Sequence, residues 1–365
     1  MFYELTNNLG GVRTPDFLLL LGKKDITRNI SKRLISLTLT DNRGFETDQL
    51  DIVLDDSDGE IELPARNAVL TLFLGWKEKV LKEKGSFTVD TIEHRGDSAD
   101  TVRITARSAN LGGTLNASRE MSWHDTTLGA IVESIAVNHE LIPAIAPELA
   151  KISISHIDKS LESDVVFLTR LADRYGATVA IKARKLLFLK AGKGVTASGE
   201  PIAPVTITRG DGDRHLFSIT DRDNYSGVTA QWLDTKNPQQ QQQNVKVEHQ
   251  SPPTKQNEYL LGKAGNVFAI KKIFANKAQA ERAAQAQWDR LQRDKVLFTI
   301  NLAIGRETLY PETPVNVTGF KSIIDAQPWV ITKLVHTLDS NGYTTALTLE
   351  VNNAEVEYSE VIKSE

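Results

Sequence analysis

Apolar and polar residues alternate along the first third of the chain, which is the pattern of half-buried antiparallel strands. Leucine and isoleucine recur at every second position in segments 36–40, 50–54 and 70–74, and turn-forming residues rich in Asp, Asn and Gly separate these segments. Residues 85–109 then read as a β-hairpin whose turn begins with an Asp-Ser pair. Several short strands at this spacing predict a small antiparallel barrel or sandwich.

The same pattern returns near the end of the chain. Counting from the aromatic residues Phe87 and Trp329, apolar residues follow at the second and fifth places and a histidine at the seventh. The return strands align with a shift of one residue, and an upstream strand ending in glycine precedes each copy. One β-unit that occurs twice explains the echo; two ordinary hairpins matching by chance are the alternative. The predicted core positions of the repeated hairpins are Phe87, Val89, Ile92 and His94 in the first copy and Trp329, Ile331, Leu334 and His336 in the second.

The segment that follows the first unit has a helical period. Asp125 is predicted to cap a helix with one apolar face, and Ser163 is predicted to cap a second helix that stops at Gly176. Short apolar strands are expected between and after these helices. This segment is therefore expected to be an α+β domain inserted between the two β-units.

The last part of the chain is predicted to form the second β-unit, with two additions. Residues 237–257 carry a glutamine run and prolines but almost no apolar residue, so we expect a mobile loop that cannot offset its own ordering entropy. Asn276 and Gln279 form a capping pair for a helix over 276–291, expected to brace the barrel from outside. The predicted fold class is mainly β, with two similar antiparallel barrels and a small α+β domain. The expected divisions are 1–115, 116–203, 204–355 and a C-terminal tail at 356–365.

Composition removes several classes of function. Lys plus Arg number 43 and Asp plus Glu number 47, so no positive field favours nucleic acid, and no specific nucleic-acid binding is expected. The absence of cysteine excludes disulfides, Cys-ligated zinc and thiol nucleophiles. The apolar run at 17–21 is too short for a signal-peptide core or a membrane span, so we expect synthesis in a cytoplasm and no membrane span.

Motifs for catalysis or metal binding do not emerge from the sequence. The seven histidines show no His-x-x-x-His spacing, and the acidic stretch 55–60 does not place its glycine as an EF-hand loop requires, so a solvated turn is favoured. Carboxylate pairs such as Glu133 and Glu140 lie on ordinary amphipathic helices. We expect no enzymatic activity, no metal and no cofactor.

Short motifs in a fixed order carry a family resemblance. They lie at 37–44, 74–76, 85–90, 122–127 and 317–321. In sequence and spacing they resemble the late control protein D family of contractile-tailed temperate phages, and the resemblance covers nearly the whole chain. The glutamine run is the clearest departure from the family pattern.

The resemblance implies a structural part of a virion tail, the hub of the baseplate, similar in plan to the hub part of type VI secretion spikes. It implies tail-tube-like barrels and a homotrimer placed between the sixfold tail tube and the threefold spike. The implied partners are therefore two further copies of the chain, the tail spike protein and a tail tube or tube-initiator protein. A tape-measure protein and other baseplate proteins are further candidates.

Two other functions stay open at this point. The first is a hub fused or coupled to a peptidoglycan hydrolase, although no unassigned segment of the chain has the length of a hydrolase domain. The second is the hub part of a secretion-system spike, which would be expected to continue into a long β-helix beyond the second β-unit.

Overall fold

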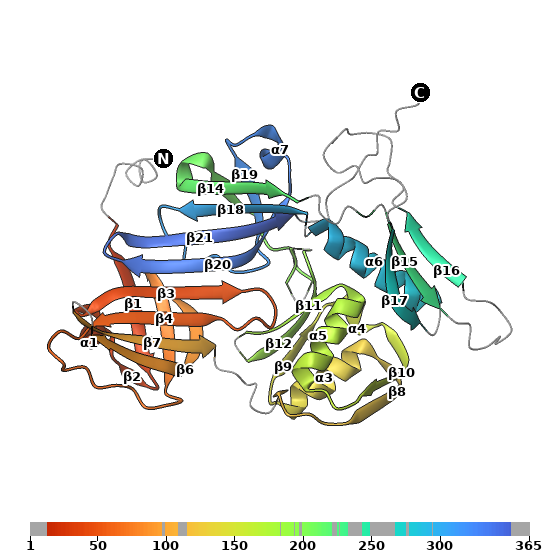
Figure 1. Cartoon of the computed structure of the whole chain (residues 1–365), viewed down its shortest axis with the longest axis horizontal. Helices are drawn as coiled ribbons and strands as arrows, with labels where there is room; N and C mark the ends of the chain where they lie inside the picture. Colours follow the sequence, from red (N-terminus) through yellow and green to blue (C-terminus); the bar gives the residue numbers. More distant parts are fainter. Residues whose placement is uncertain are drawn as a thin grey trace.

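A thirteen-stranded sheet joins the two ends of the chain (Figure 1). The computed structural model describes residues 13–96, 99–108, 115–182, 184–192, 194–196, 199–220, 225, 227–232, 243–248, 267–274, 277–293 and 295–351. Within these residues, one sheet of two strands and two of three strands accompany the large sheet. The fold is mainly β, as the alternation of apolar residues predicts.

The first unit occupies one half of the large sheet. Its strands follow the order β3-β4-β7-β6-β5-β1-β2, and their alternate leucine and isoleucine side chains are buried in one cluster. The elements are β1 (Pro15–Leu21), β2 (Lys24–Asp25), α1 (Thr27–Ser31), β3 (Leu34–Asn42), β4 (Gln49–Asp55), β5 (Val69–Trp76), β6 (Lys82–Gly96) and β7 (Asp100–Ser108).

The second unit has the same strand order as the first. Its strands run β14-β18-β21-β20-β19-β13, which matches β3-β4-β7-β6-β5-β1 strand for strand in both space and sequence order. One difference is that β13 pairs with β19 in parallel, whereas β1 pairs with β5 antiparallel. The elements are β13 (Val205–Thr208), the 3₁₀ turn η1 (Arg209–Asp211), β14 (Gly212–Ile219), β18 (Val296–Leu302), β19 (Pro314–Thr318), α7 (Ser322–Asp325), β20 (Trp329–Asp339) and β21 (Gly342–Val351).

A β-bulge at the same place in both hairpins explains the spacing of their apolar residues. In the first hairpin the pairing of β6 with β7 shifts between Val89 and Thr91. In the second hairpin the pairing of β20 with β21 shifts between Ile331 and Lys333. Apolar residues three places apart would face opposite sides of a regular strand, but one extra residue returns them to the same side. The second and fifth places can therefore both serve the core.

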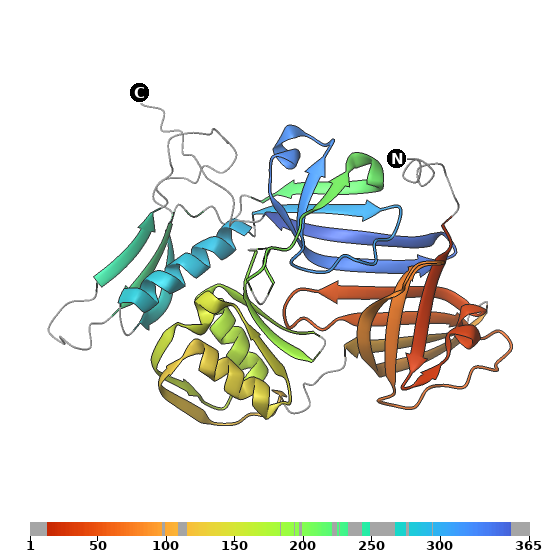
Figure 2. The ribbon, with the colours of Figure 1, turned by 180° about the vertical axis from the view of Figure 1, so that it is seen from behind.

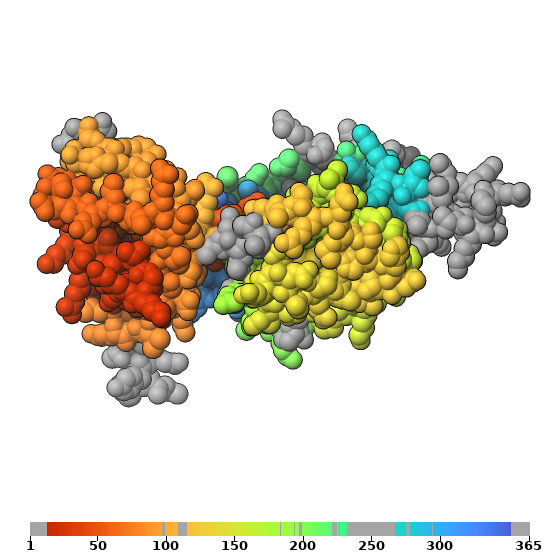
Figure 3. Space-filling model, turned by 90° about the horizontal axis from the view of Figure 1, so that it is seen from below, coloured from red at the N-terminus to blue at the C-terminus, as the bar shows by residue number. Residues whose placement is uncertain are grey.

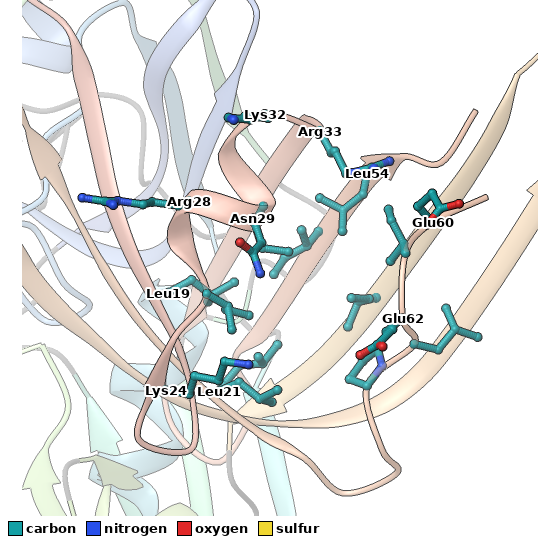
Figure 4. A pocket seen from close by; sticks show the side chains of 18 of the residues that line it. Leu19, Leu21, Lys24, Arg28, Asn29, Lys32, Arg33, Leu54, Glu60 and Glu62 are labelled. Atoms are coloured by element: carbon teal, nitrogen blue, oxygen red, sulfur yellow. The ribbon is translucent and has the colours of Figure 1, made fainter. Parts of the chain in front are cut away.

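Strand pairing among the described residues does not close either unit into a barrel. In the first unit, the short strand β2 pairs with the end of β1, and helix α1 leads on to β3. An open cavity of about 660 Å³ lies there, with Leu19 and Leu21 among its apolar lining. Figure 4 shows Arg28 on the helix at one side of the cavity and Glu60 on the opposite side. The expected closed barrel is thus an open sheet, because a five-residue helix offers no edge for strand pairing.

The inserted domain contains the two predicted helices, α3 and α5, and the four-residue helix α4, packed with short strands (Figure 2). Ser163 caps the second helix, and Gly176 ends it with a φ of 61°, both as predicted. The first helix is capped by Thr127, whose hydroxyl accepts a hydrogen bond from the Ala130 N–H at 3.2 Å. Asp125 was expected to be the cap, but it lies in a strand that continues to Thr127. The elements are β8 (Met121–Thr127), α3 (Leu128–Asn138), β9 (Ile142–Ile145), α4 (Pro147–Ala150), β10 (Ser153–Lys159), α5 (Asp164–Tyr175), β11 (Ala177–Lys182) and β12 (Lys185–Lys190).

A small α/β layer is inserted between β14 and β18. It comprises β15 (Gly227–Trp232), β16 (Gln243–Glu248), β17 (Val267–Phe274) and α6 (Lys277–Arg293). Helix α6 lies across this sheet and also contacts α5, with Arg290 3.7 Å from Asp173 (Figure 2). The predicted helix is confirmed, whereas its proposed cap Asn276 lies outside the described residues.

The segment expected to be a mobile loop contains a strand. Residues 243–248 form β16, which pairs antiparallel with β15, so the expectation of a loop fails for these residues. Alternating Val245 and Val247 are the apolar residues of this strand. The remaining residues of 237–257, like the expected tail at 356–365, lie outside the described part of the chain.

Four buried apolar clusters correspond to the first unit, the second unit, the inserted domain and the small α/β layer. Seen from below, the first unit (red to orange) and the inserted domain (yellow) form two masses side by side (Figure 3). Leu338 and Tyr343, although they belong to the second hairpin, are part of the cluster of the first unit. The two units therefore share some of their core.

Replacing Phe87 or Trp329 with alanine should destabilise the protein by roughly 3 to 5 kcal/mol each. Both aromatic side chains are fully buried, and each replacement leaves a cavity in a different cluster. Denaturant unfolding followed by tryptophan fluorescence and circular dichroism measures the change. Val137→Ala, at an exposed position on α3, is the control and should have little effect. A large loss for one aromatic residue and none for the other would contradict the matched roles.

Candidate functional site

The eight positions predicted from the repeat are buried in the second hairpin and only partly buried in the first. Trp329, Ile331, Leu334 and His336 are all buried, as are Phe87 and Val89, and Ile92 is half-buried. The His94 side chain is 47% exposed, so its predicted core role fails in the single chain. The physical reason is that, in the described part of the chain, no strand lies beside this part of β6 on the side away from β7.

The corresponding part of β20 does have a neighbour, and this neighbour belongs to the other unit. Strand β20 pairs with β19 only through its first two residues. From Lys333 onward it pairs antiparallel with β3, in a register that places His336 opposite Leu39 and Asp339 opposite Ser36. This pairing, which we call the joint, makes the two units one continuous sheet (Figure 1).

A hydrogen-bonded group of aromatic residues lies at the joint. The His336 Nδ1 lies 3.0 Å from the hydroxyls of both Thr345 and Tyr343. The Tyr343 ring packs against Trp76 of the first unit with 5.3 Å between centroids, and the Trp76 indole N–H donates to the Gly305 carbonyl at 3.2 Å. Hydrogen bonds and ring packing therefore connect the units beyond the strand ladder.

Burial lowers the pKa of two basic side chains near the joint. Burial, with a smaller effect from the charge of Lys84, holds the pKa of His336 well below its usual value. Burial also lowers the pKa of Lys84 to about 8, and its ammonium donates a hydrogen bond to the Leu309 carbonyl at 3.3 Å. The imidazole of His336 is therefore neutral at pH 7, as a core residue should be.

A buried guanidinium connects the β3–β4 turn to the second unit. Arg43 donates to Glu350 of β21, and its Nε forms an ion pair with Glu312 that lacks hydrogen-bond geometry. Burial opposes the charge of Arg43, but the two carboxylates outweigh it and raise its pKa. Glu312 Oε2 also accepts from the Gly192 N–H at 3.1 Å, which brings the inserted domain to the same place. Three parts of the chain therefore meet at one charge cluster.

A second ion-pair group ties the inserted domain to the first unit. The Lys182 ammonium donates to Asp41 at 2.8 Å and also to Asp48. Burial opposes the charge of Lys182, and the two carboxylates outweigh it and raise its pKa. Burial raises the pKa of Asp48, an effect that Lys182 partly offsets. The domain is therefore attached through one carboxylate near the end of β3 and one directly before β4.

These charged residues were not found by sequence reasoning. Arg43 and Glu350 are 307 positions apart, and no local spacing links them. Among the described residues no group of three or more potential ligands could hold a metal ion, and no helix is long and apolar enough to cross a membrane. The acidic turn at 55–60 is held by hydrogen bonds between Arg33 and Asp58.

Replacing Arg43 with methionine should lower the free energy of unfolding by about 3 kcal/mol or more, because Glu312 and Glu350 would keep buried charges without their main cation. Thermal melting of the purified chain is the measurement. Arg33→Met is the matched control, since its partner Asp58 is 53% exposed and the pair is well solvated. Equal effects of the two replacements would show that the cluster is no more important than a surface pair.

Acid should weaken the joint through His336. Its folded-state pKa is depressed, so below about pH 6.5 the unfolded chain binds a proton that the folded chain does not, and stability falls as the pH falls. Between pH 7.5 and 5.5 the wild type should lose about 1 kcal/mol more stability than His336→Gln, which cannot titrate. Urea unfolding at the two pH values gives the difference. Parallel losses in both proteins would remove His336 as the cause.

The chain is similar over almost its whole length to two phage proteins. The probable baseplate hub protein of Escherichia phage 186 is 53% identical over 384 residues, covering 98% of both chains. The probable baseplate hub protein of Escherichia phage P2 is 54% identical over 386 residues, with the same coverage.

Solved structures of distant proteins share the fold. The 43 kDa tail protein of prophage MuSo2 from Shewanella oneidensis superposes with a TM-score of 0.65 at 15% identity, covering 92% of this chain and 98% of that one. The E. coli c3393 protein, a component of the type VI secretion system, gives a TM-score of 0.53 at 12% identity, covering 90% and 76%. At these identities the likeness concerns the fold alone.

The family described as phage tail baseplate hub (GPD) matches residues 30–342, which include the inserted domain and most of both repeated units. The resemblance carried by the short sequence motifs is thereby confirmed. With this match, and with relatives more than half identical over nearly their full length, the chain belongs to the phage tail baseplate hub family.

Proposed function

We propose that three copies of this chain form a ring that joins the sixfold tail tube to the threefold spike. As a member of the hub family, the chain is a structural, non-enzymatic component of the baseplate of a contractile phage tail. The observation that supports the ring is the strand order shared by the two units. A chain that carries one unit twice presents six similar units when three copies assemble around an axis.

The two kinds of symmetry require such an adaptor. A sixfold tube offers six equivalent contacts, and six similar units can meet them evenly. The true symmetry of the ring remains threefold, because the inserted domain and the small α/β layer occur once in each chain. One face of the ring would then fit the tube, or a tube-initiator protein, and the other would fit a trimeric spike.

The open form of each unit is consistent with this role. A sheet that is not closed leaves strand edges, and an exposed edge is a site for pairing with another chain. We propose that the units reach their tube-like form only when neighbouring units in the ring cover these edges. The balanced composition, with a net charge of −4, would let DNA or a tape-measure protein pass without a strongly positive surface to hold phosphates.

The number of copies tests the adaptor. Sedimentation equilibrium of the purified chain should give three times the chain mass of 40.4 kDa. Purified tail particles should contain three hub chains for each tube end, counted by quantitative mass spectrometry against the tube protein. Six copies for each particle, or a chain that stays monomeric at all concentrations and in the particle, would overturn the threefold adaptor.

A further inference from the structure

Among the strand edges of the large sheet that have no partner in the described part of the chain, two correspond to the strands of the joint. One is the second half of β6, residues 91–96, beyond the point where β5 ends its pairing. The other is the outer edge of β14, which is the first strand of the sheet. Both edges are exposed, and Leu216 and Ile219 of β14 are 58% and 40% exposed. An apolar, unpaired edge strand is a site that proteins cover.

The repeat shows which strands these edges correspond to. In the first unit β7 pairs with β4, which pairs with β3; in the second unit β21 pairs with β18, which pairs with β14. Following the register from strand to strand places His215 at the position of Leu37, and Phe217 at the position of Leu39. Strand β14 therefore takes the place of β3, and β6 takes the place of β20.

The joint pairs the corresponding strands inside the chain. There β20 uses the edge that is free in β6, and β3 uses the edge that is free in β14. Positions that are buried at the joint are less buried on the free edges. At the joint His336 and Leu39 are buried, whereas at the equivalent positions the His94 side chain is 47% exposed and Phe217 is half-buried. His94 is thus exposed because β6 lacks the neighbouring strand that β20 has at the joint.

The backbone of β14 is oriented for such pairing. At the joint the Arg43 N–H donates to the Thr332 carbonyl, so alternate residues of β3 direct their N–H groups towards β20. In the second unit the Thr220 N–H donates to the Lys295 carbonyl, towards β18. Alternation then directs the N–H and C=O groups of Ile219 and Phe217 outward, as at the corresponding positions of β3.

We propose that β6 of one copy pairs antiparallel with β14 of a second copy in the register of the joint. This interface rests on the proposed homotrimer and specifies how its copies meet. A second copy of the chain is the expected partner of these edges, because the joint already pairs the equivalent strands within one chain. The proposed opposed pairs are Ile92 with Ile219, Glu93 with Ser218, His94 with Phe217 and Arg95 with Leu216 of the second copy.

This pairing gives a head-to-tail contact, which suits the proposed ring and does not give a two-fold dimer. Each copy offers one β6 edge and one β14 edge, so every contact joins two different surfaces, and repetition in a closed circle returns to the first copy. In the closed ring no copy keeps a free β6 or β14 edge. Six contacts of one kind would then alternate around the ring, three within chains and three between them.

Engineered cysteines test the register, because the chain contains no cysteine of its own. Glu93 and Ser218 would be a non-hydrogen-bonded pair, whose Cα atoms lie about 4.5 Å apart, within the reach of a disulfide. The variant Glu93→Cys/Ser218→Cys should therefore form intermolecular disulfides after mild oxidation. The matched control Glu93→Cys/Leu216→Cys displaces one cysteine by two residues, or roughly 7 Å along the strand, and should not crosslink efficiently.

Non-reducing gel electrophoresis and sedimentation of the full chain separate the outcomes. Covalent trimers from the in-register pair, at least ten times more abundant than from the control, are the result expected. A trimer by sedimentation that crosslinks with neither pair, or equally with both, would overturn this interface and leave the threefold adaptor standing. A chain that stays monomeric at all concentrations and in the particle, with no crosslink, would overturn both.

Discussion

The backbone pairing of β20 with β3 is the interaction on which the arrangement of the molecule depends. Without it the two units would be separate sheets connected by a long insertion, and their relative position would be set by side chains alone. A ladder of main-chain hydrogen bonds fixes both the separation and the direction of neighbouring strands. The aromatic group around His336 lies within this ladder, the charge cluster around Arg43 lies at its end, and both resist its displacement.

A fixed relation between the units is what the proposed adaptor needs. If each unit could tilt against the other, six units around an axis would not meet a rigid tube evenly. The core of the first unit includes Leu338 and Tyr343 from the second hairpin, so a tilt would expose buried apolar surface. The attachment of the inserted domain through Lys182 and Glu312 adds a third body to the same point. The chain thus behaves as one structural part with several outward surfaces.

Sequence reasoning recovered what is periodic and local. Alternation predicted the strands, Ser163 and Gly176 marked the second helix, and the echo between the hairpins indicated one unit used twice. It failed where a distant neighbour decides the outcome. Asp125 lies in a strand because β8 pairs with β10, and residues 243–248 form a strand because β15 lies beside them. The joint and the Arg43 cluster have no local signature, since their members are some 300 positions apart.

The distance along the chain between β3 and β20 also affects how the protein is made. Ribosomes deliver roughly 5–20 residues per second, so the first unit emerges tens of seconds before the strand that completes its edge. During that interval β3 is an unpaired edge that a second nascent chain could occupy. Each hub must capture its own β20 before another copy does, and the supply rate of chains in an infected cell would influence how many hubs are built correctly.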